Sequence, residues 1–237
     1  MSRLIDFHSH ILPGIDDGSK TVDMSIAMLR MEAEQGIRHV VATPHFYPQQ
    51  DTPERFLRRR AEAEYVLREA MGKYDNLPKL SLGAEVYYFP GISDSDAISK
   101  LTIDEKHCIL IEMPMASWTE AMYGDLEGLY VKRGLIPIVA HVDRYIGRFR
   151  NHGILKRLAQ LPVLVQANAE FFQERSTSSL ALRMLKKDGI HLLGSDCHDL
   201  SSRKPNLKET QDLILRRLGK EALEGIFACQ QNVLAEE

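Results

Sequence analysis

Histidine and carboxylate residues stand near the ends of apolar runs in this chain, at spacings that suit metal binding. The first run carries His8 and His10, and the last carries Asp196 and His198. Because side chains alternate between the two faces of a strand, residues two apart point the same way and can bind one ion. A mixture of imidazole and carboxylate suits manganese, iron or zinc. The two pairs therefore predict a metal centre.

Candidate metal donors recur at the same point of six of the runs. They are His8, His10, Asp17, His45, Glu85, Glu112, His141, Asp196 and His198. Any one of them alone is better explained as a hydrogen-bonded or solvated residue, but that explanation does not account for the recurrence. So many donors exceed the coordination of one zinc or calcium ion, and the pattern predicts a cluster of two or three ions. Such clusters generate hydroxide near neutral pH and clamp a phosphoryl group during its displacement.

The elements that must position these donors are β-like runs that alternate with helical patterns. The runs cover residues 3–10, 37–45, 79–88, 108–113, 135–141, 163–170 and 190–198. Most are continuously apolar, which is typical of parallel strands buried on both faces. Helices are predicted over residues 21–35, 52–71, 118–133, 153–160, 177–187, 206–218 and 220–228. Gly36 is a C-terminal signal for the first helix, and Thr52 with Pro53 forms an N-terminal signal for the second.

The alternation continues along the whole chain without a linker, which predicts a single α/β domain over residues 1–237. Both doubly wound sheets and barrels place their sites at the carboxyl ends of the strands. An open sheet would spread donors from six strands over roughly 30 Å, at about 4.8 Å per strand. A closed barrel brings them to one axis, so the pattern favours a barrel of about seven strands.

Composition and charge exclude several classes of function. A formal net charge of −3 gives no general attraction to nucleic acid or to anionic membranes. No apolar stretch approaches the roughly 20 residues that span a bilayer. The first residues lead directly into a β-like run without a secretory signal. Three scattered cysteines indicate a reducing compartment, so a cytoplasmic protein is expected.

Four segments together resemble the polymerase-and-histidinol-phosphatase (PHP) superfamily. They are HSHILPGIDDG at residues 8–18, ATPH at 42–45, AHVDRY at 140–145 and GSDCH at 194–198. Within that superfamily, the LPGIDDG and HVDRY stretches are similar to those of bacterial manganese-dependent protein-tyrosine phosphatases from capsule and exopolysaccharide operons. The resemblance extends from residue 4 to about residue 206, with the motifs in the expected order.

The resemblance implies an α/β fold of the PHP type, a distorted seven-stranded (β/α)7 barrel. It implies that the candidate donors are ligands of Mn2+, with iron or zinc as alternative metals. It also implies two or three ions per chain, with Glu85 as the residue that bridges them. It also makes Arg144 and Arg203 the phosphate-binding catalytic residues. Bidentate guanidinium geometry matches a phosphoryl group, whereas the alternative for either arginine is an exposed salt bridge.

The function implied is hydrolysis of phosphotyrosine on a protein by metal-bound hydroxide. By the same resemblance, the partner is an autophosphorylating bacterial tyrosine kinase that controls polysaccharide export. A small-molecule phosphoesterase, such as a histidinol-phosphate phosphatase, is the alternative enzyme, and a non-catalytic metal-binding regulatory partner is an alternative of another class. The physiological substrate, native metal, general acid and oligomeric state stay open, a homo-oligomer included.

Cys197 and Arg203 match the Cys-x5-Arg spacing of phosphatases that use a cysteine nucleophile. Such a loop wraps successive amides around phosphate, usually with the help of glycine, yet no glycine lies between these two residues and Pro205 follows. Strand alternation also turns Cys197 away from its neighbours Asp196 and His198. We therefore predict that Cys197 is a small buried residue without a catalytic role.

Some smaller questions stay open at this point. Asp16 adjoins Asp17, and spacing alone does not separate a metal ligand from a residue that supports one. Gln166 and Asn168 either line the pocket or form hydrogen bonds in the core. Residues 58–60 are three arginines on a helix that also carries glutamates, which predicts a solvated face.

Overall fold

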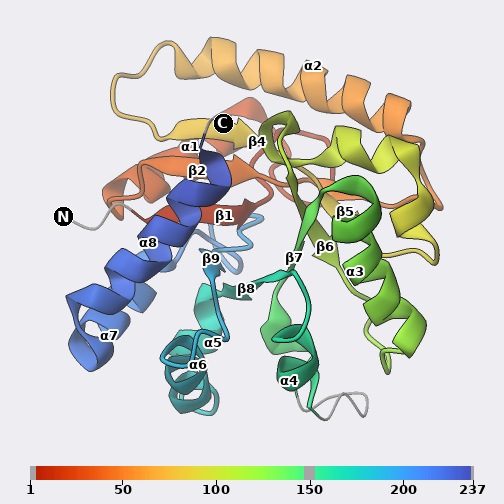
Figure 1. Ribbon diagram of the computed structural model, residues 1–237. Helices are drawn as coiled ribbons and strands as arrows, with labels where there is room; N and C mark the ends of the chain where they lie inside the picture. Colours follow the sequence, from red (N-terminus) through yellow and green to blue (C-terminus); the bar gives the residue numbers. More distant parts are fainter. Residues whose placement is uncertain (1–3, 147–152, 236–237) are drawn as a thin grey trace.

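The computed structural model describes residues 4–146 and 153–235, and shows parallel strands with helices around them (Figure 1). The strands are β1 (Ile5–Ser9), β2 (His39–Ala42), β3 (His45–Phe46), β4 (Lys79–Leu82), β5 (Glu85–Tyr87), β6 (Cys108–Glu112), β7 (Ile136–Val139), β8 (Leu164–Asn168) and β9 (Leu192–Gly194). The α-helices are α1 (Val22–Glu34), α2 (Pro53–Met71), α3 (Glu120–Arg133), α4 (Ile154–Leu158), α5 (Ala169–Gln173), α6 (Ser178–Leu185), α7 (Leu207–Leu218) and α8 (Lys220–Leu234). Short 3-10 helices are η1 (Ile92–Asp94), η2 (Asp96–Leu101), η3 (Ile103–Glu105) and η4 (Val142–Arg144).

All strand pairings in the described residues are parallel, and they form two sheets. One sheet has the order β1-β2-β4, and the other has the order β3-β5-β6-β7-β8-β9. The α/β class with a parallel sheet is therefore confirmed. The count of seven strands is not confirmed, because two predicted runs are each divided into two strands.

The first division falls at Thr43-Pro44, where proline has no N–H for a strand ladder, and the second falls at Gly83-Ala84. Contact between the two runs continues through both breaks. The Gly83 N–H donates to the Ala42 carbonyl at 2.8 Å, and the Glu85 N–H donates to the Pro44 carbonyl at 3.0 Å. The two runs thus pass from one sheet to the other as a pair.

The first and last runs of the chain lie side by side. A parallel bridge joins Ser9 to Cys197, and the Asp196 N–H donates to the His8 carbonyl at 2.7 Å. The His10 N–H donates to the Cys197 carbonyl at 2.9 Å. This pairing brings two segments that are far apart in the sequence to the same edge, where both carry candidate metal donors.

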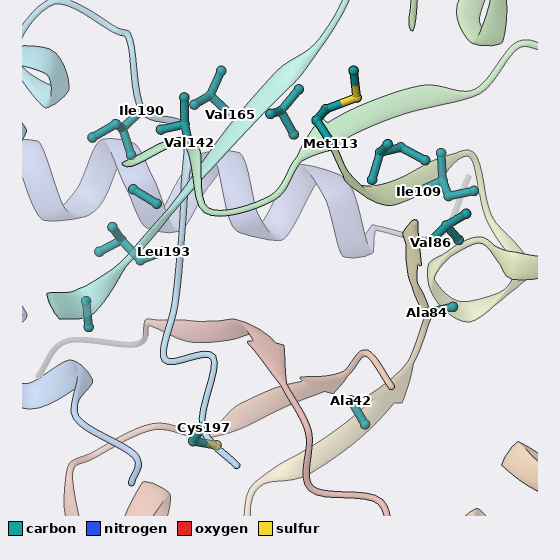
Figure 2. Close-up of a cluster of buried hydrophobic side chains, with 14 of the residues drawn as sticks. Ala42, Ala84, Val86, Ile109, Met113, Val142, Val165, Ile190, Leu193 and Cys197 are labelled. Atoms are coloured by element: carbon teal, nitrogen blue, oxygen red, sulfur yellow. The ribbon is translucent and has the colours of Figure 1, made fainter. Parts of the chain in front are cut away.

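Apolar side chains fill both sides of the strands, which explains the continuous apolar runs. On β6, Leu110 belongs to a smaller buried cluster, whereas its neighbours Ile109 and Ile111 belong to the larger one. Figure 2 shows part of the larger cluster, including Ile109, Val165 and Leu193 from three strands. Burial of each such side chain stabilises the fold by about 1.5–3 kcal/mol. The prediction that the strands are buried on both faces is confirmed.

Threonine side chains cap the N-termini of the first two helices. The Thr21 side chain accepts a hydrogen bond from the Met24 N–H, and the Thr52 side chain accepts one from the Arg55 N–H with Pro53 as the first helical residue. The run at 163–170 is shorter than predicted, because β8 ends at Asn168 and α5 follows. The 3-10 segments of residues 92–105 were not predicted. No helix in the described residues is long and apolar enough to cross a membrane.

Candidate metal centre

Glu85, at the start of β5, lies at the centre of the histidines. Its Oε2 atom is 3.2 Å from His8 Nε2, 3.3 Å from His10 Nε2 and 3.0 Å from His45 Nδ1. Its Oε1 atom is 2.8 Å from His141 Nε2. A single buried carboxylate thus faces four imidazoles that come from three parts of the chain, namely the ends of β1 and β7 and the start of β3. This is the arrangement expected of a carboxylate that bridges cations.

Asp17 and His198 extend the group toward solvent. Asp17 Oδ1 is 3.3 Å from His198 Nε2 and 3.5 Å from His45 Nε2, and the Asp17 side chain is 64% exposed. Donor atoms of these three residues and of His10 lie within 4.8 Å of one another. Asp17 therefore forms the solvent-facing edge of the centre.

Glu112 and Asp196 complete the set on either side of Glu85. Glu112 Oε1 is 3.7 Å from His141 Nε2, and Asp196 Oδ1 is 3.5 Å from His8 Nε2 and 3.4 Å from His10 Nε2. The structure thus brings all of the predicted donors into one continuous cluster. None of the nine predicted donors lies outside this cluster.

Several donor atoms in the cluster are buried but make no hydrogen bond within the described part of the chain. They are His45 Nδ1, Glu85 Oε2, Glu112 Oε2 and His198 Nε2. Each of them lies within 3.9 Å of a histidine nitrogen or a carboxylate oxygen of the cluster, but without hydrogen-bond geometry. A buried polar atom that lacks a hydrogen bond costs roughly 1–3 kcal/mol. A bound cation would satisfy these atoms together, so the residues fit a metal cluster.

The pKa shifts within the cluster are also consistent with cation binding. Burial would raise the pKa of Glu85, but the surrounding histidines, His8 foremost, hold that pKa well below its ordinary value. Burial would lower the pKa of His10, whereas the carboxylates of Asp16, Asp196 and Glu85 raise it well above its ordinary value. Burial and the neighbouring Glu85 raise the pKa of Glu112. Without cations, the carboxylates favour protons on His8 and His10, and metal ions would compete for the same nitrogens.

Two donors have an unusual backbone, and a glycine makes room for a third. His141 has φ of 31° and Asp196 has φ of 52°, in the left-handed region that non-glycine residues seldom adopt. A Cβ atom at Gly194 would lie 2.5 Å from the Cβ atom of His8 and 2.8 Å from Nε2 of Gln166. The backbone is therefore strained or closely packed where it presents these candidate donors.

The two predicted arginines converge on Asp196. Arg144, at the end of η4, forms an ion pair with Asp196 Oδ2, and Arg203 Nη2 lies 2.9 Å from Asp196 Oδ1. Their side chains are 34% and 39% exposed, respectively, so both guanidinium groups lie at the boundary between cluster and solvent. Two positive charges beside the cluster can bind an anion.

Comparisons with known proteins agree with this geometry. The family of capsular polysaccharide synthesis proteins CpsB/CapC matches residues 4–235 of the chain. The chain belongs to the CpsB/CapC family. The tyrosine-protein phosphatase CpsB of Streptococcus pneumoniae is 29% identical over 244 residues, covering 94% of this chain and 95% of the relative. The tyrosine-protein phosphatase YwqE of Bacillus subtilis (strain 168) is 27% identical over 229 residues, covering 92% and 86%.

A solved structure shows the same fold for this CpsB/CapC member. It comes from crystal structures of YwqE from Bacillus subtilis and CpsB from Streptococcus pneumoniae, described as unique metal-dependent tyrosine phosphatases. The TM-score is 0.84 at 24% sequence identity, and the match covers 99% of this chain and 96% of the other.

Asp16 supports the cluster of this CpsB/CapC chain from behind. Its Oδ2 atom is 2.8 Å from His10 Nδ1 and accepts from the His45 N–H at 3.0 Å, and its Oδ1 atom accepts from the Gly18 N–H at 2.9 Å. A carboxylate on the outer nitrogen of a histidine fixes the ring and leaves its other nitrogen for a metal. The open question about Asp16 and Asp17 is answered: Asp16 holds His10, and Asp17 faces the cluster.

Gln166 and Asn168 are buried hydrogen-bonding residues beneath the cluster. Gln166 Oε1 accepts from the His141 N–H at 2.6 Å and lies 3.3 Å from His8 Nδ1. Asn168 Nδ2 donates to Asp196 Oδ2 at 3.0 Å. The core alternative is therefore correct, and these amides also hold three donors in place.

Sequence reasoning missed Tyr145 as a functional residue. Its hydroxyl lies 3.2 Å from His141 Nδ1 and accepts from the Met113 N–H at 3.1 Å. The contact orients His141 so that Nε2 faces Glu85. The tyrosine was visible within the AHVDRY motif, but nothing in the local pattern showed that its ring turns back toward the cluster.

Cys197 lies in the larger apolar cluster (Figure 2) and is fully buried. Burial and nearby carboxylates, Asp6 and Glu32, raise the pKa of its thiol well above the ordinary value. A nucleophilic cysteine needs a lowered pKa and access to substrate. The prediction that Cys197 is a small buried residue is confirmed.

The prediction for the three arginines of α2 was wrong in part. Arg58 is exposed, as expected. Arg60 is only 6% exposed and donates to the Gly83 carbonyl at 2.8 Å. The helix lies against the Gly83 break, where a free carbonyl needs a donor, and local charge pattern does not reveal this contact.

Proposed function

We propose that this protein is a metal-dependent protein-tyrosine phosphatase. The observation that carries the proposal is the placement of Glu85 Oε2 within 3.3 Å of three histidine nitrogens, in a cluster that contains every predicted donor. The cluster occurs in a CpsB/CapC chain whose curated relatives are named tyrosine-protein phosphatases. A merely structural role would not require so many donor atoms around one carboxylate that lack a hydrogen bond within the described residues.

The proposed metal ligands are the nine sequence-predicted residues, with Glu85 as the bridge between ions. They are His8, His10, Asp17, His45, Glu85, Glu112, His141, Asp196 and His198. Two or three Mn2+ ions per chain fit the number and type of donors, with iron or zinc as alternatives. When bound, such ions act as Lewis acids and make hydroxide available near neutral pH.

The residues of the chain bind and orient the phosphate. Arg144 and Arg203 donate charge-assisted hydrogen bonds to phosphoryl oxygens and stabilise the negative charge that these oxygens carry in the transition state. Both now pair with Asp196, so binding of phosphate exchanges one anionic partner for another. The tyrosinate leaving group has a conjugate acid with a pKa near 10, so it departs without strong acid assistance.

The protein substrate is a bacterial tyrosine kinase of the capsule or exopolysaccharide system. The family's role in capsular polysaccharide synthesis supports this assignment. We further propose that residues 1–237 form one PHP-type domain in the cytoplasm, a distorted barrel in which each of the two divided runs counts as one of seven strands. A homo-oligomer is compatible with this function but is not required by it.

The test is a phosphatase assay on purified protein with and without metal. A chelator should abolish hydrolysis of a phosphotyrosine peptide, and Mn2+ should restore it. The same preparation is assayed on histidinol phosphate, which tests the small-molecule alternative. Full turnover of the peptide by metal-free protein would refute the metal mechanism, and a preference for histidinol phosphate would refute the protein-phosphatase assignment.

A further inference from the structure

An open pocket of about 600 Å³ adjoins the metal centre on the side of Asp17 and His45. Both residues line it, and beyond them its walls come from the loop after β3 and from the first turns of α2. Those further lining residues are Tyr47, Gln50, Asp51, Arg55 and Arg59. In Figure 1, α2 is the long helix near the top of the view. The pocket thus joins the proposed catalytic centre to a surface that the phosphatase chemistry itself does not use.

Near the start of α2, the pocket holds more positive than negative side chains. Asp51 Oδ2 is 2.6 Å from Arg59 Nη2, and Asp51 Oδ1 is 3.2 Å from Arg55 Nε. One carboxylate therefore faces two guanidinium groups, which leaves one positive charge locally uncompensated. The other pocket carboxylates, Asp16 and Asp17, lie at the metal centre, where Asp16 pairs with His10, Asp17 lies 3.3 Å from His198 Nε2, and the proposed cations would offset the remaining negative charge.

The two arginines have different roles. Arg59 is fixed, because its Nη1 also donates to the Ile15 carbonyl at 2.9 Å. Arg55 has a side chain that is 63% exposed, and its terminal nitrogens donate no hydrogen bond to a residue in the described ranges 4–146 and 153–235. Arg55 therefore presents free donors to the pocket, while Asp51 holds its Nε in place.

An aromatic ring, that of Tyr47, also lines the pocket beside the metal centre. The Tyr47 ring stacks on His45 with centroids 5.0 Å apart, and it lies 5.7 Å from the Tyr87 ring. The proposed phosphate-binding arginines instead contact Asp196, a residue that does not line this pocket. A phosphotyrosine held at the metal centre would occupy the end of the pocket at Asp17 and His45, and it would leave the end at Arg55 for the adjoining part of the substrate chain.

From this arrangement we infer that the pocket is a specificity site for an acidic side chain next to the phosphotyrosine, and that Arg55 binds its carboxylate. The inference rests on the proposed phosphatase function and adds a preference among substrates. Guanidinium and carboxylate groups form bidentate hydrogen bonds, and the terminal nitrogens of Arg55 provide the donors. Asp51 and Arg59 position Arg55 and do not themselves need to contact the substrate.

The experiment compares two phosphotyrosine peptides that differ only in flanking residues, glutamate in one and glutamine in the other. The Mn2+-loaded wild-type protein should show a kcat/KM about three- to tenfold higher for the glutamate peptide, as expected for a partly exposed ion pair. Arg55→Gln should bring this ratio close to one. Arg58→Gln removes the same charge from the exposed side of the same helix and should keep the wild-type ratio.

The ratio is internal to each protein preparation, so a partly unfolded variant does not distort it. Added salt should reduce the wild-type ratio, because an exposed ion pair is screened. Equal kcat/KM values for the two peptides in wild type, or an unchanged ratio in Arg55→Gln, would overturn the inference while the phosphatase function stands. No hydrolysis of either peptide by wild type would refute the proposed function, and the specificity site with it.

Discussion

Replacement of Asp16 by asparagine should weaken metal binding although Asp16 faces no metal position. The carboxylate satisfies three groups at once, namely His10 Nδ1 at 2.8 Å, the His45 N–H at 3.0 Å and the Gly18 N–H at 2.9 Å. An amide has a single oxygen. Whichever way the substituted side chain turns, its NH2 group replaces an accepting oxygen and leaves at least one of these donors without a partner.

The size of the effect follows from the contact to His10. Burial would raise the pKa of Asp16, but the bond to His10 and its charge lower that pKa below its ordinary value. A hydrogen bond to a charged group contributes about 1.5–3 kcal/mol. Loss of a carboxylate that orients a ligating histidine typically weakens metal binding by about 10- to 100-fold, or about 1.4–2.7 kcal/mol. We expect a loss in that range for Asp16→Asn.

The assay is a competition titration of Mn2+ against a chelator of known affinity, with thermal unfolding of the metal-free protein measured in parallel. Asp23→Asn is the matched control. Asp23 is an exposed aspartate in the first turn of α1, and it makes no ion pair or side-chain hydrogen bond to a cluster residue within the described ranges. The control should bind Mn2+ like wild type. If Asp16→Asn also binds Mn2+ like wild type, then Asp16 does not hold a ligating His10 and the assignment of the centre is wrong at that point.

The remaining predictions concern the ions, the thiol and the phosphate site. Elemental analysis of fully loaded protein should give more than one ion per chain, and Glu85→Ala should lower that number because Glu85 is the proposed bridge. A single ion in wild type would contradict a cluster. Cys197→Ala should keep turnover within about tenfold, since no sulfur nucleophile is used, and near-complete loss at unchanged metal content would restore the cysteine mechanism. Arg144→Ala and Arg203→Ala should each lower kcat/KM by about 30- to 1,000-fold, equivalent to about 2–4 kcal/mol, at unchanged metal content. Wild-type turnover by both alanine variants would make these arginines surface residues, whereas Arg144→Lys should rescue only part of the loss.

Local sequence rules account for the donors because each donor depends on its own run. His8 and His10 are two apart near the end of a strand, and alternation directs both to the same cluster, with their Nε2 atoms 3.1 Å apart. The same rule turns Cys197 away from the metal side. Thr52 and Pro53 start α2 through contacts within one helical turn. Predictions of this kind succeed because the interactions that decide them span only a few residues.

The tertiary structure decided the roles of residues whose hydrogen-bond partners lie far away in the sequence. Gln166 became a support for His8, a residue 158 positions away, and Arg60 became a buried donor to the carbonyl of Gly83. Two runs divided at Pro44 and at Gly83, so the sheets differ from the seven strands that periodicity predicts.

By itself, then, the sequence determined which residues could bind metal and the α/β class that would gather them. The structure determined how each is held, and that Arg55 lies in the pocket beside the centre. The physical reason is that a strand's periodicity fixes only the direction of a side chain. Its hydrogen-bond partners are fixed when distant segments pack together, as at the pairing of Ser9 with Cys197 that brings the two ends of the donor set into contact.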